Sequence, residues 1–149
     1  MINIEINNDD RQKAVEVLKY KNFGNRSSGF NGSYEKQYTG LIGELTTYRL
    51  LEMDPPNYNE GRIDTDILVN GKKIDVKSML RKHDMRDNWV HNFVGYQKEI
   101  SSDILLFVNI NRNTKKVQLC GWLNKKNFLE TADFYNKGDL RTRDDGTSF

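Results

Sequence analysis

The sequence predicts a single α/β domain in which a mixed sheet of four to five strands is flanked by helices on both faces. Three observations predict this class: apolar residues recur at helical spacing in two segments, an Asn-Gly pair separates two alternating segments, and a nearly continuous apolar run follows later. A chain of 149 residues, of which 36% are hydrophobic, can bury one core. We therefore expect one domain over residues 1–149, with a loosely held, charged tail from about residue 136.

The first half of the chain predicts two helices. Residues 10–20 follow capping residues and carry apolar side chains on one face. Ser33 can cap a second helix over residues 34–53, and the prolines of "DPPN" end it because proline cannot continue the hydrogen-bond ladder. The stretch between them, residues 21–33, is rich in Gly, Ser and Asn and predicts a loop.

The next segment predicts a β-hairpin. Asn70-Gly71 is the strongest short-range signal for a two-residue turn, because both turn residues must adopt positive φ, and the flanking segments alternate apolar and polar residues. This turn sets the register of the two strands. The predicted cross-strand pairs are Val69 with Lys72, Leu68 with Lys73, Ile67 with Ile74, Asp66 with Asp75, Thr65 with Val76 and Asp64 with Lys77.

One face of this hairpin is apolar and the other is charged. The apolar face contains Ile63, Thr65, Ile67, Val69, Ile74 and Val76, whereas the charged face contains Asp64, Asp66, Asp75 and Lys77. Carboxylates that face each other across two strands repel, and a divalent cation between them would remove that repulsion. Mg²⁺ often takes only one or two carboxylates together with water and a substrate phosphate. The alternative is a solvated face on which Asp64 and Lys77 form a weak surface pair.

The second half predicts the remaining elements. Residues 89–94 are expected to form a short strand and residues 94–102 a helical turn. Residues 103–110 form the continuous apolar run expected of a buried central strand, and residues 115–123 are expected to form another strand. A final short helix is expected over residues 124–134. Two side chains of the last strand, Cys120 and Trp122, are interpreted as core residues.

Glu44 is an unexpected residue in the second predicted helix. It lies three positions after Leu41 and four before Tyr48, so it projects near the apolar stripe. Gly40 and Gly43 would let this helix approach neighbouring backbone, so that Glu44 could reach the charged face of the hairpin. The alternative is that Glu44 sits at the edge of the stripe and extends to water, where it could pair with Lys77.

The order of these motifs resembles the PD-(D/E)XK nuclease superfamily, some of whose members are phage-encoded. The resemblance covers residues 34–128: a helix with an acidic residue, a strand bearing an Asp, a hairpin, the acid-x-Lys motif Asp75-Val76-Lys77, and then a helix and core strands. It implies a restriction-endonuclease-like fold and a Mg²⁺-dependent endonuclease that hydrolyses DNA phosphodiester bonds. The absence of an added recognition domain favours a structure-selective enzyme or a homodimer that cuts two strands.

The resemblance also implies roles for individual residues. Asp66, Asp75 and Glu44, with the Val76 carbonyl, would hold Mg²⁺, and Mn²⁺ should substitute in such an oxygen-rich site. Lys77 would hold the attacking water or stabilise the charge that builds on the phosphate.

Two departures from the family pattern bear on the assignment. Thr65 occupies the place of the usual proline, and two aspartates compete for the strand position. We choose Asp66 because it faces Asp75, and we keep Asp64 as an accessory candidate. Gln97 is a second accessory candidate, because some branches carry a glutamine in the following helix.

Basic residues at the hairpin tip and after the second hairpin strand are candidates for contact with nucleic acid. They are Lys72, Lys73, Arg81, Lys82 and Arg86. Contacts from such residues to phosphates would give affinity that does not depend on base sequence and that falls with salt. The alternative is that these charges are simply solvated. The aromatic residues Trp89, His91 and Tyr96 could stack on bases or pack beside the sheet.

Composition excludes some classes and leaves others open. The single cysteine excludes an internal disulfide and a cysteine-rich zinc site, and no apolar run reaches membrane-spanning length. The N-terminal segment lacks a signal-peptide profile, so we expect a cytoplasmic protein without a membrane partner, in the host cytoplasm for a phage-encoded member. The net charge of +2 does not by itself indicate a DNA partner. A catalytically silent nucleic-acid-binding or partner-binding module and an RNA-cleaving enzyme are the competing functions.

Overall fold

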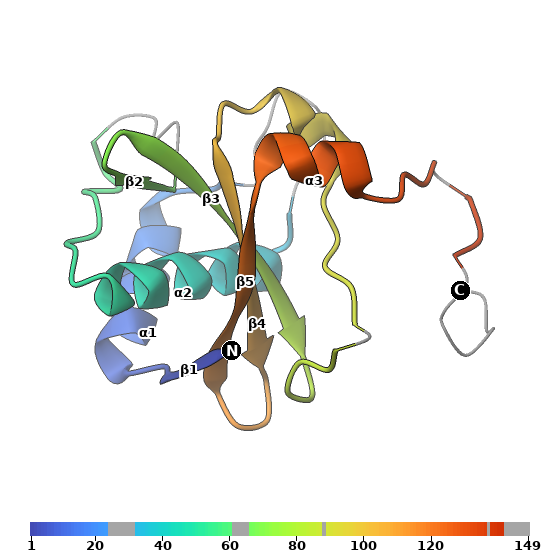
Figure 1. Cartoon of the computed structure of the whole chain (residues 1–149). Helices are drawn as coiled ribbons and strands as arrows, with labels where there is room; N and C mark the ends of the chain where they lie inside the picture. Colours follow the sequence, from blue (N-terminus) through green and yellow to red (C-terminus); the bar gives the residue numbers. More distant parts are fainter. Residues whose placement is uncertain (24–31, 61–65, 88, 137, 142–149) are drawn as a thin grey trace.

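The computed structural model describes residues 1–23, 32–60, 66–87, 89–136 and 138–141. In chain order its elements are β1 (Ile2–Glu5), α1 (Asn8–Tyr20), α2 (Tyr34–Leu50), β2 (Ile67–Val69), β3 (Lys72–Arg81), the 3₁₀ helix η1 (Gly95–Glu99), β4 (Ile104–Asn111), β5 (Lys116–Asn124) and α3 (Lys125–Thr131). They form one five-stranded sheet with the strand order β1-β5-β4-β3-β2 (Figure 1). The predicted mixed α/β class is confirmed.

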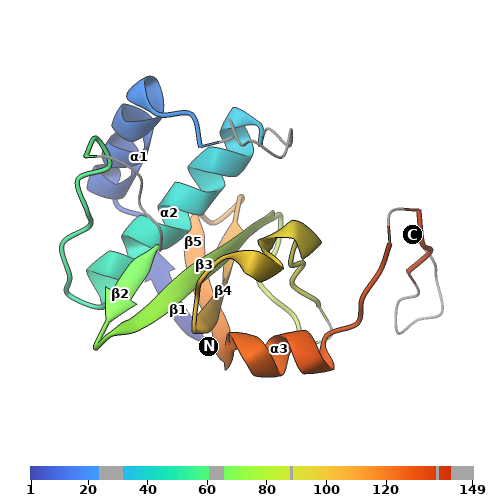
Figure 2. The ribbon, with the colours of Figure 1, turned by 90° about the horizontal axis from the view of Figure 1, so that it is seen from above.

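The helices lie on both sides of this sheet. Figure 2 shows α1 and α2 together on one side, and η1 and α3 on the other. α1 is joined to α2 by an ion pair in which Arg49 Nη2 lies 2.9 Å from Asp10 Oδ2. Within the described parts of the chain, no helix has the length and apolar character needed to cross a membrane.

The hairpin forms in the predicted register. Ile67 pairs with Ile74, Leu68 with Lys73 and Val69 with Lys72. Both turn residues have positive φ, 48° at Asn70 and 75° at Gly71. β3 then pairs parallel to β4, whereas all other strand pairs are antiparallel. The predicted pairs of Asp64 and Thr65 lie outside the described residues.

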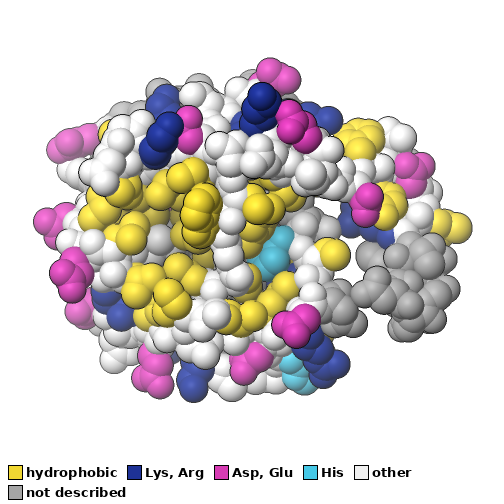
Figure 3. All heavy atoms as spheres, in the orientation of Figure 1, with side chains coloured by type: hydrophobic (Ala, Val, Ile, Leu, Met, Phe, Trp, Pro, Cys, Tyr) yellow, Lys and Arg dark blue, Asp and Glu magenta, His cyan; other side chains and the backbone are white. Residues whose placement is uncertain are grey.

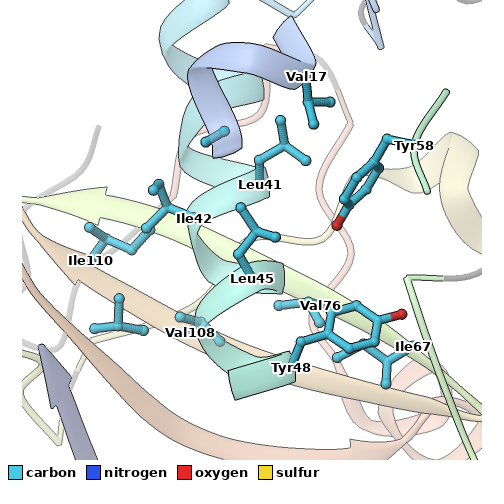
Figure 4. Packing of buried hydrophobic residues seen from close by; sticks show 12 residues of the cluster. Val17, Leu41, Ile42, Leu45, Tyr48, Tyr58, Ile67, Val76, Val108 and Ile110 are labelled. Atoms are coloured by element: carbon cyan, nitrogen blue, oxygen red, sulfur yellow. The ribbon is translucent and has the colours of Figure 1, made fainter. Parts of the chain in front are cut away.

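The main core lies between α2 and the sheet. Ile42 projects from α2 toward Ile110 of β4, whereas Leu41 lies on the side of Val17 of α1, and Val76 and Val108 of the sheet are buried in the same cluster (Figure 4). Side chains alternate between the two faces of a strand, so Val76 faces α2 while its neighbours Asp75 and Lys77 face the side of η1 and α3. This alternation separates the apolar core from the polar half of the candidate site.

α2 approaches β3 closely at one glycine. A Cβ atom at Gly43 would lie 2.0 Å from Ser78 Oγ, whereas a Cβ atom at Gly40 would have no neighbour within 4 Å. The close approach predicted for this glycine pair is therefore confirmed at Gly43 alone. It places the following residue, Glu44, near the hairpin.

Two expectations were wrong, and one strand was not predicted. Residues 89–94 form no strand, because β3 already has β2 and β4 as neighbours, and this segment instead packs across the sheet with His91 against Phe107. β1 was not predicted, because its four residues are mostly exposed and form a strand only by pairing with β5. Trp122 is no core residue: it is 65% exposed.

Candidate active site

The candidate site lies where the hairpin meets α2. Asp66 immediately precedes β2, Asp75 and Lys77 lie on β3, and Glu44 lies in the middle of α2. The structure therefore brings together four residues from three elements, and they are the four that the sequence analysis selected. The accessory candidate Asp64 lies outside the described residues.

Asp66 and Asp75 form a buried pair of carboxylates. The backbone N–H of Val76 donates a hydrogen bond of 2.7 Å to Asp66 Oδ2, which holds this carboxylate beside β3. Burial, followed by the neighbouring charge of Asp75, raises the pKa of Asp66 to about 7. The raised pKa of Asp66 therefore reflects first the loss of solvent around its carboxylate and then the repulsion by Asp75.

Lys77 offsets part of this negative charge. Its Nζ lies 2.6 Å from Asp75 Oδ2, and the two side chains are only 13% and 11% exposed. That oxygen of Asp75 is buried, and among the described residues it has no regular hydrogen bond besides this ion contact. Lys77 Nζ also lies 5.4 Å from the centroid of the Phe93 ring. The alternative of a solvated charged face therefore does not hold for Asp75 and Lys77.

Glu44 lies close enough to the same carboxylates for their charges to act on it. The residue keeps partial exposure, but its carboxylate is enclosed, and burial followed by the charges of Asp66 and Asp75 raises its pKa well above the usual range. The Tyr58 hydroxyl donates to Glu44 Oε2 at 3.4 Å and partly opposes this shift. The ammonium of Lys77 contacts Asp75 and forms no ion pair with Glu44.

Two tyrosines support the site, although the sequence analysis did not assign them to it. The Tyr48 hydroxyl donates to the backbone oxygen of Asp66 at 2.5 Å, and Tyr58, 4% exposed, bonds to Glu44. Tyr48 was recognised only as a member of the apolar stripe. Tyr58 follows two prolines in a loop, where no periodic pattern could have indicated burial.

The donors present suit a hard divalent cation with few protein ligands. Within the described residues, no group of three or more His, Cys, Asp or Glu side chains is arranged to hold a metal ion. Mg²⁺ does not require such a group, because it commonly keeps several waters and uses one or two carboxylates. The carboxylates of Asp66 and Asp75 and the Val76 carbonyl are the candidate donors, and the incompletely satisfied Asp75 Oδ2 is consistent with this chemistry.

The candidate nucleic-acid-binding residues differ in whether their charged groups are exposed or form hydrogen bonds within the protein. Lys72, Lys82 and Arg86 are exposed, whereas Lys73 Nζ donates to Ser101 Oγ at 3.3 Å. The guanidinium of Arg81 turns inward. It donates to Asn109 Oδ1 at 3.0 Å and to the Val90 backbone oxygen at 2.5 Å, and burial lowers its pKa.

A buried polar network holds the segment 82–87, which carries Lys82 and Arg86, against the sheet. Gln118 Oε1 accepts from the Met85 backbone N–H at 2.7 Å and from Asn109 Nδ2 at 3.0 Å. Asn111 Nδ2 donates to Asp84 Oδ1 at 2.6 Å. Sequence reasoning did not identify this network, although polar residues inside two strands that are otherwise apolar could have indicated it.

Two of the aromatic residues of the same region contact other side chains of the protein. The guanidinium carbons of Arg81 and Arg86 each lie 5.4 Å from the Trp89 ring centroid. His91 packs beside the sheet, with its ring centroid 5.3 Å from that of Phe107, and burial lowers its pKa to about 4. The side chain of Tyr96 lies outside the described residues.

Gln97, the second accessory candidate, lies in η1. Its backbone oxygen accepts a hydrogen bond of 3.3 Å from the ammonium of Lys125, a buried residue that also donates to the Ile100 backbone oxygen. Lys125 therefore anchors the end of η1 to the start of α3.

No protein-family model, curated protein or solved structure matches this chain.

Proposed function

We propose that the protein is a metal-dependent deoxyribonuclease that hydrolyses DNA phosphodiester bonds as an endonuclease. The observation that carries the proposal is the convergence of three carboxylates, Glu44, Asp66 and Asp75, with Lys77 in one partly buried site. Such a concentration of like charge is unfavourable in a folded protein, and perturbed carboxylates of this kind are typical of functional sites. The restriction-endonuclease-like arrangement implied by the motif order supports the same function.

The two aspartates would hold Mg²⁺, with Mn²⁺ as a substitute. Asp66 is already oriented by the Val76 N–H, and Asp75 is fixed on the adjacent strand, so little side-chain ordering would be needed on binding. A bound Mg²⁺ lowers the pKa of a water ligand and neutralises charge on a phosphate. Glu44 is placed to accept a proton or to orient water at the edge of this site.

Lys77 is the residue best placed to interact with the reacting phosphate. Its ammonium is a compact charge held by Asp75 and by the ring of Phe93, so it is oriented without being fully neutralised. A lysine at this position would stabilise the charge that develops on phosphate oxygens in the transition state. Lys72, Lys82 and Arg86 would add phosphate contacts outside the site.

One observation favours a second candidate, a catalytically silent nucleic-acid-binding or partner-binding module. The ion contact between Lys77 and Asp75 is short and partly buried, so these two groups could serve stability alone. This candidate predicts DNA or partner binding without turnover and without a requirement for metal.

The test is a cleavage assay on supercoiled plasmid, linear duplex, single-stranded DNA, a four-way junction and RNA, with Mg²⁺, Mn²⁺ or EDTA. The variants are Asp75→Asn and Lys77→Met, which keep side-chain size, and Lys19→Met serves as a matched control because it removes an exposed lysine on α1. We expect metal-dependent cutting of DNA that each site variant reduces by at least about 100-fold and that the control leaves unchanged.

Each other outcome has a defined meaning. Cutting that survives both site substitutions would refute the assignment of the hairpin as the active site. DNA binding without cutting under any metal condition would favour the silent module, and preferential cutting of RNA would replace the deoxyribonuclease assignment.

A further inference from the structure

A small pocket lies where α1, α2 and the turn between β4 and β5 meet. It has a volume of about 280 Å³ and lies on the side of the sheet that carries α1 and α2 (Figure 2). Leu80 of β3 and Ile110 of β4, which pair with each other, both line it. Leu80 lies five residues after Asp75, roughly 17 Å along β3, and faces the opposite side of the sheet. The pocket is therefore separate from the candidate active site.

The floor of this pocket is apolar. Ile42 and Ile110 are buried in it, and Ile6 is half-buried beside them. Tyr38 also lines the pocket, and its ring is stacked on that of Tyr34 with the ring centroids 6.4 Å apart. Ligand sites typically have volumes of roughly 300–1,000 Å³, so a pocket at the lower end of this range suits a small molecule.

Cationic side chains surround the apolar floor. Arg11 of α1, together with Arg112 and Lys115 of the β4–β5 turn, lines the pocket, and Glu35 of α2 is the one carboxylate among its described lining residues. Three positive charges and one negative charge give the lining a net charge of +2. Burial raises the pKa of the Tyr38 hydroxyl, which is therefore neutral at pH 7, and the charge of Arg11 acts against this shift. The pocket therefore favours an anion.

These cations are available to a ligand. Arg112 Nη2 lies 2.5 Å from Glu35 Oε1, but the two side chains are 53% and 64% exposed, and an exposed ion pair contributes little to stability. Within the described parts of the chain, the ammonium of Lys115 forms no ion pair, and the guanidinium of Arg11 donates one long hydrogen bond, of 3.4 Å, to the Ile6 backbone oxygen. An anion of higher charge could therefore displace Glu35 and bind all three cations.

The combination of an apolar floor with cations at its rim narrows the class of ligand. On the face shown in Figure 3, hydrophobic side chains gather between the β2–β3 hairpin, α2 and β5, and most Lys and Arg side chains lie toward the edges of the view. The pocket instead joins both kinds of side chain in one small volume. A purely apolar ligand would leave the cations without a partner, and inorganic phosphate would leave the apolar floor uncovered.

A nucleoside monophosphate satisfies both parts of the pocket. A phosphate monoester carries a charge of about −1.5 to −2 at pH 7, which matches the lining, whereas a carboxylate or a phosphodiester carries one negative charge. A nucleobase can cover the apolar floor and stack near Tyr38 without hydrogen bonds. The polar side chains in the lining are already engaged, because Thr39 donates to the Glu35 backbone oxygen and Asn111 donates to Asp84. We therefore expect little preference among bases.

We propose that this pocket binds a nucleoside monophosphate, either free or as the phosphorylated end of a DNA strand, with its phosphate at Arg11, Arg112 and Lys115. The base would lie over the floor formed by Ile42 and Ile110. This site does not depend on the chemistry proposed for the carboxylates, which face the other side of the sheet.

The first test is a titration of the full chain with deoxyadenosine monophosphate, followed by the amide signals in NMR spectra. EDTA is present, so that no metal ion can hold the phosphate at the carboxylates. We expect a dissociation constant below about 1 mM, with shifted signals in residues 35–42 and 110–115. Deoxyadenosine and inorganic phosphate should each bind at least about 10-fold more weakly, because each satisfies only one part of the pocket. Shifts confined to residues 66–77, or equal affinity for either fragment, would overturn the proposal.

Substitutions in the lining give an independent test. Arg112→Met and Lys115→Met should each weaken binding by at least about 10-fold, because each removes a charged hydrogen bond to the phosphate. Glu35→Gln should strengthen binding by about 2- to 5-fold, because the competing ion pair with Arg112 is lost. Lys116→Met is the matched control, since Lys116 is exposed, follows Lys115 and does not line the pocket. Equal weakening by this control, or unchanged affinity in both lining variants, would refute the site. Circular dichroism establishes that the variants are folded.

An oligonucleotide with a 5′-terminal phosphate distinguishes the two sources of the ligand. Binding that requires this phosphate and that Lys115→Met weakens would identify the strand end as a ligand, whereas binding of the free nucleotide alone would identify a free nucleotide. If neither the free nucleotide nor the terminal phosphate is bound, the pocket is no nucleotide site.

Discussion

Asp66 shows how the surroundings of a single side chain define the chemistry of this site. Its carboxylate is buried, it faces Asp75, and one of its oxygens accepts the Val76 N–H. Burial and the second carboxylate raise its pKa to about 7, while the backbone hydrogen bond acts against this shift. The folded chain therefore keeps a proton here at pH values where an exposed aspartate has lost it.

This shift predicts a specific dependence of stability on pH. Because the pKa of Asp66 is higher in the folded than in the unfolded chain, its contribution to stability is present below about pH 4 and is lost as the pH rises through about 7. Asp66→Asn removes this titration and can still accept the Val76 N–H. Between pH 5 and pH 8 we expect the wild type to lose on the order of 2 kcal/mol more unfolding free energy than the variant, measured by urea denaturation.

A control variant and the addition of Mg²⁺ distinguish this effect from a general dependence of stability on pH. Asp54→Asn, which changes an exposed aspartate, should leave the wild-type pH dependence unchanged. Mg²⁺ at pH 8 should raise the thermal unfolding midpoint of the wild type but not of Asp66→Asn. If Asp66→Asn lost as much stability as the wild type between these pH values, the assignment of the raised pKa would be wrong.

The packing of two elements, α2 and β3, depends on one glycine. Gly43 stands against Ser78, whose hydroxyl is buried and has no hydrogen-bond partner among the described residues. This contact positions the helix so that Glu44, the next residue, reaches the hairpin carboxylates. The site therefore depends on how closely two elements approach.

Substitutions at the two glycines of α2 should have opposite effects. Gly43→Ala would place its methyl group 2.0 Å from Ser78 Oγ and should destabilise the protein by about 1–3 kcal/mol. Gly40→Ala has open space around its Cβ position and should stabilise the protein by up to about 1 kcal/mol through helix propensity. Urea denaturation measures both.

Adding Ser78→Ala provides a rescue for this pair. The smaller side chain removes the clashing oxygen, so the double variant Gly43→Ala/Ser78→Ala should regain most of the stability lost in Gly43→Ala. Gly43→Ala as stable as the wild type, or no rescue in the double variant, would contradict the role given to this contact.

The whole molecule separates its basic residues into structural and exposed sets. Arg81 donates to Asn109 and to the Val90 backbone, whereas Lys82 and Arg86 face solvent in the segment that the Asn109–Gln118 network holds. This separation places exposed cations at one end of the sheet. It also explains why a charge in the sequence does not by itself indicate a contact with nucleic acid.

Substitutions in the two sets should therefore have different effects on DNA binding and on stability. Lys82→Ala and Arg86→Ala should each weaken binding and lower the slope of log affinity against log salt concentration by about 1, at unchanged stability. Arg81→Ala should instead reduce the unfolding free energy by about 1–3 kcal/mol, because Asn109 Oδ1 would lose its donor. Fluorescence anisotropy with a labelled duplex and urea denaturation measure these effects.

A cation on the far side of the molecule is the control for this prediction. Lys19→Ala, on α1, should change neither the salt slope nor the stability appreciably. If Lys19→Ala lowered the slope as much as Arg86→Ala, the segment 82–87 would not be the binding surface.

The features that depend on local geometry could be predicted from the sequence. The Asn70-Gly71 turn sets the hairpin register because both residues must adopt positive φ, and that register places Asp66 near Asp75 and leaves Lys77 on the same face. The caps at Asn7 and Ser33 and the apolar run of β4 are local in the same sense.

Contacts between residues that lie far apart in the chain could not be predicted in this way, because they depend on the folded structure. The convergence of Glu44 and Tyr58 with the hairpin depends on the approach at Gly43, and β1 becomes a strand only through its partner β5. Whether a side chain is buried depends on what covers it, so Arg81 turned out to face inward and Trp122 outward. Periodicity and turn chemistry act over a few residues, whereas burial and electrostatic coupling arise between residues that lie far apart in the chain.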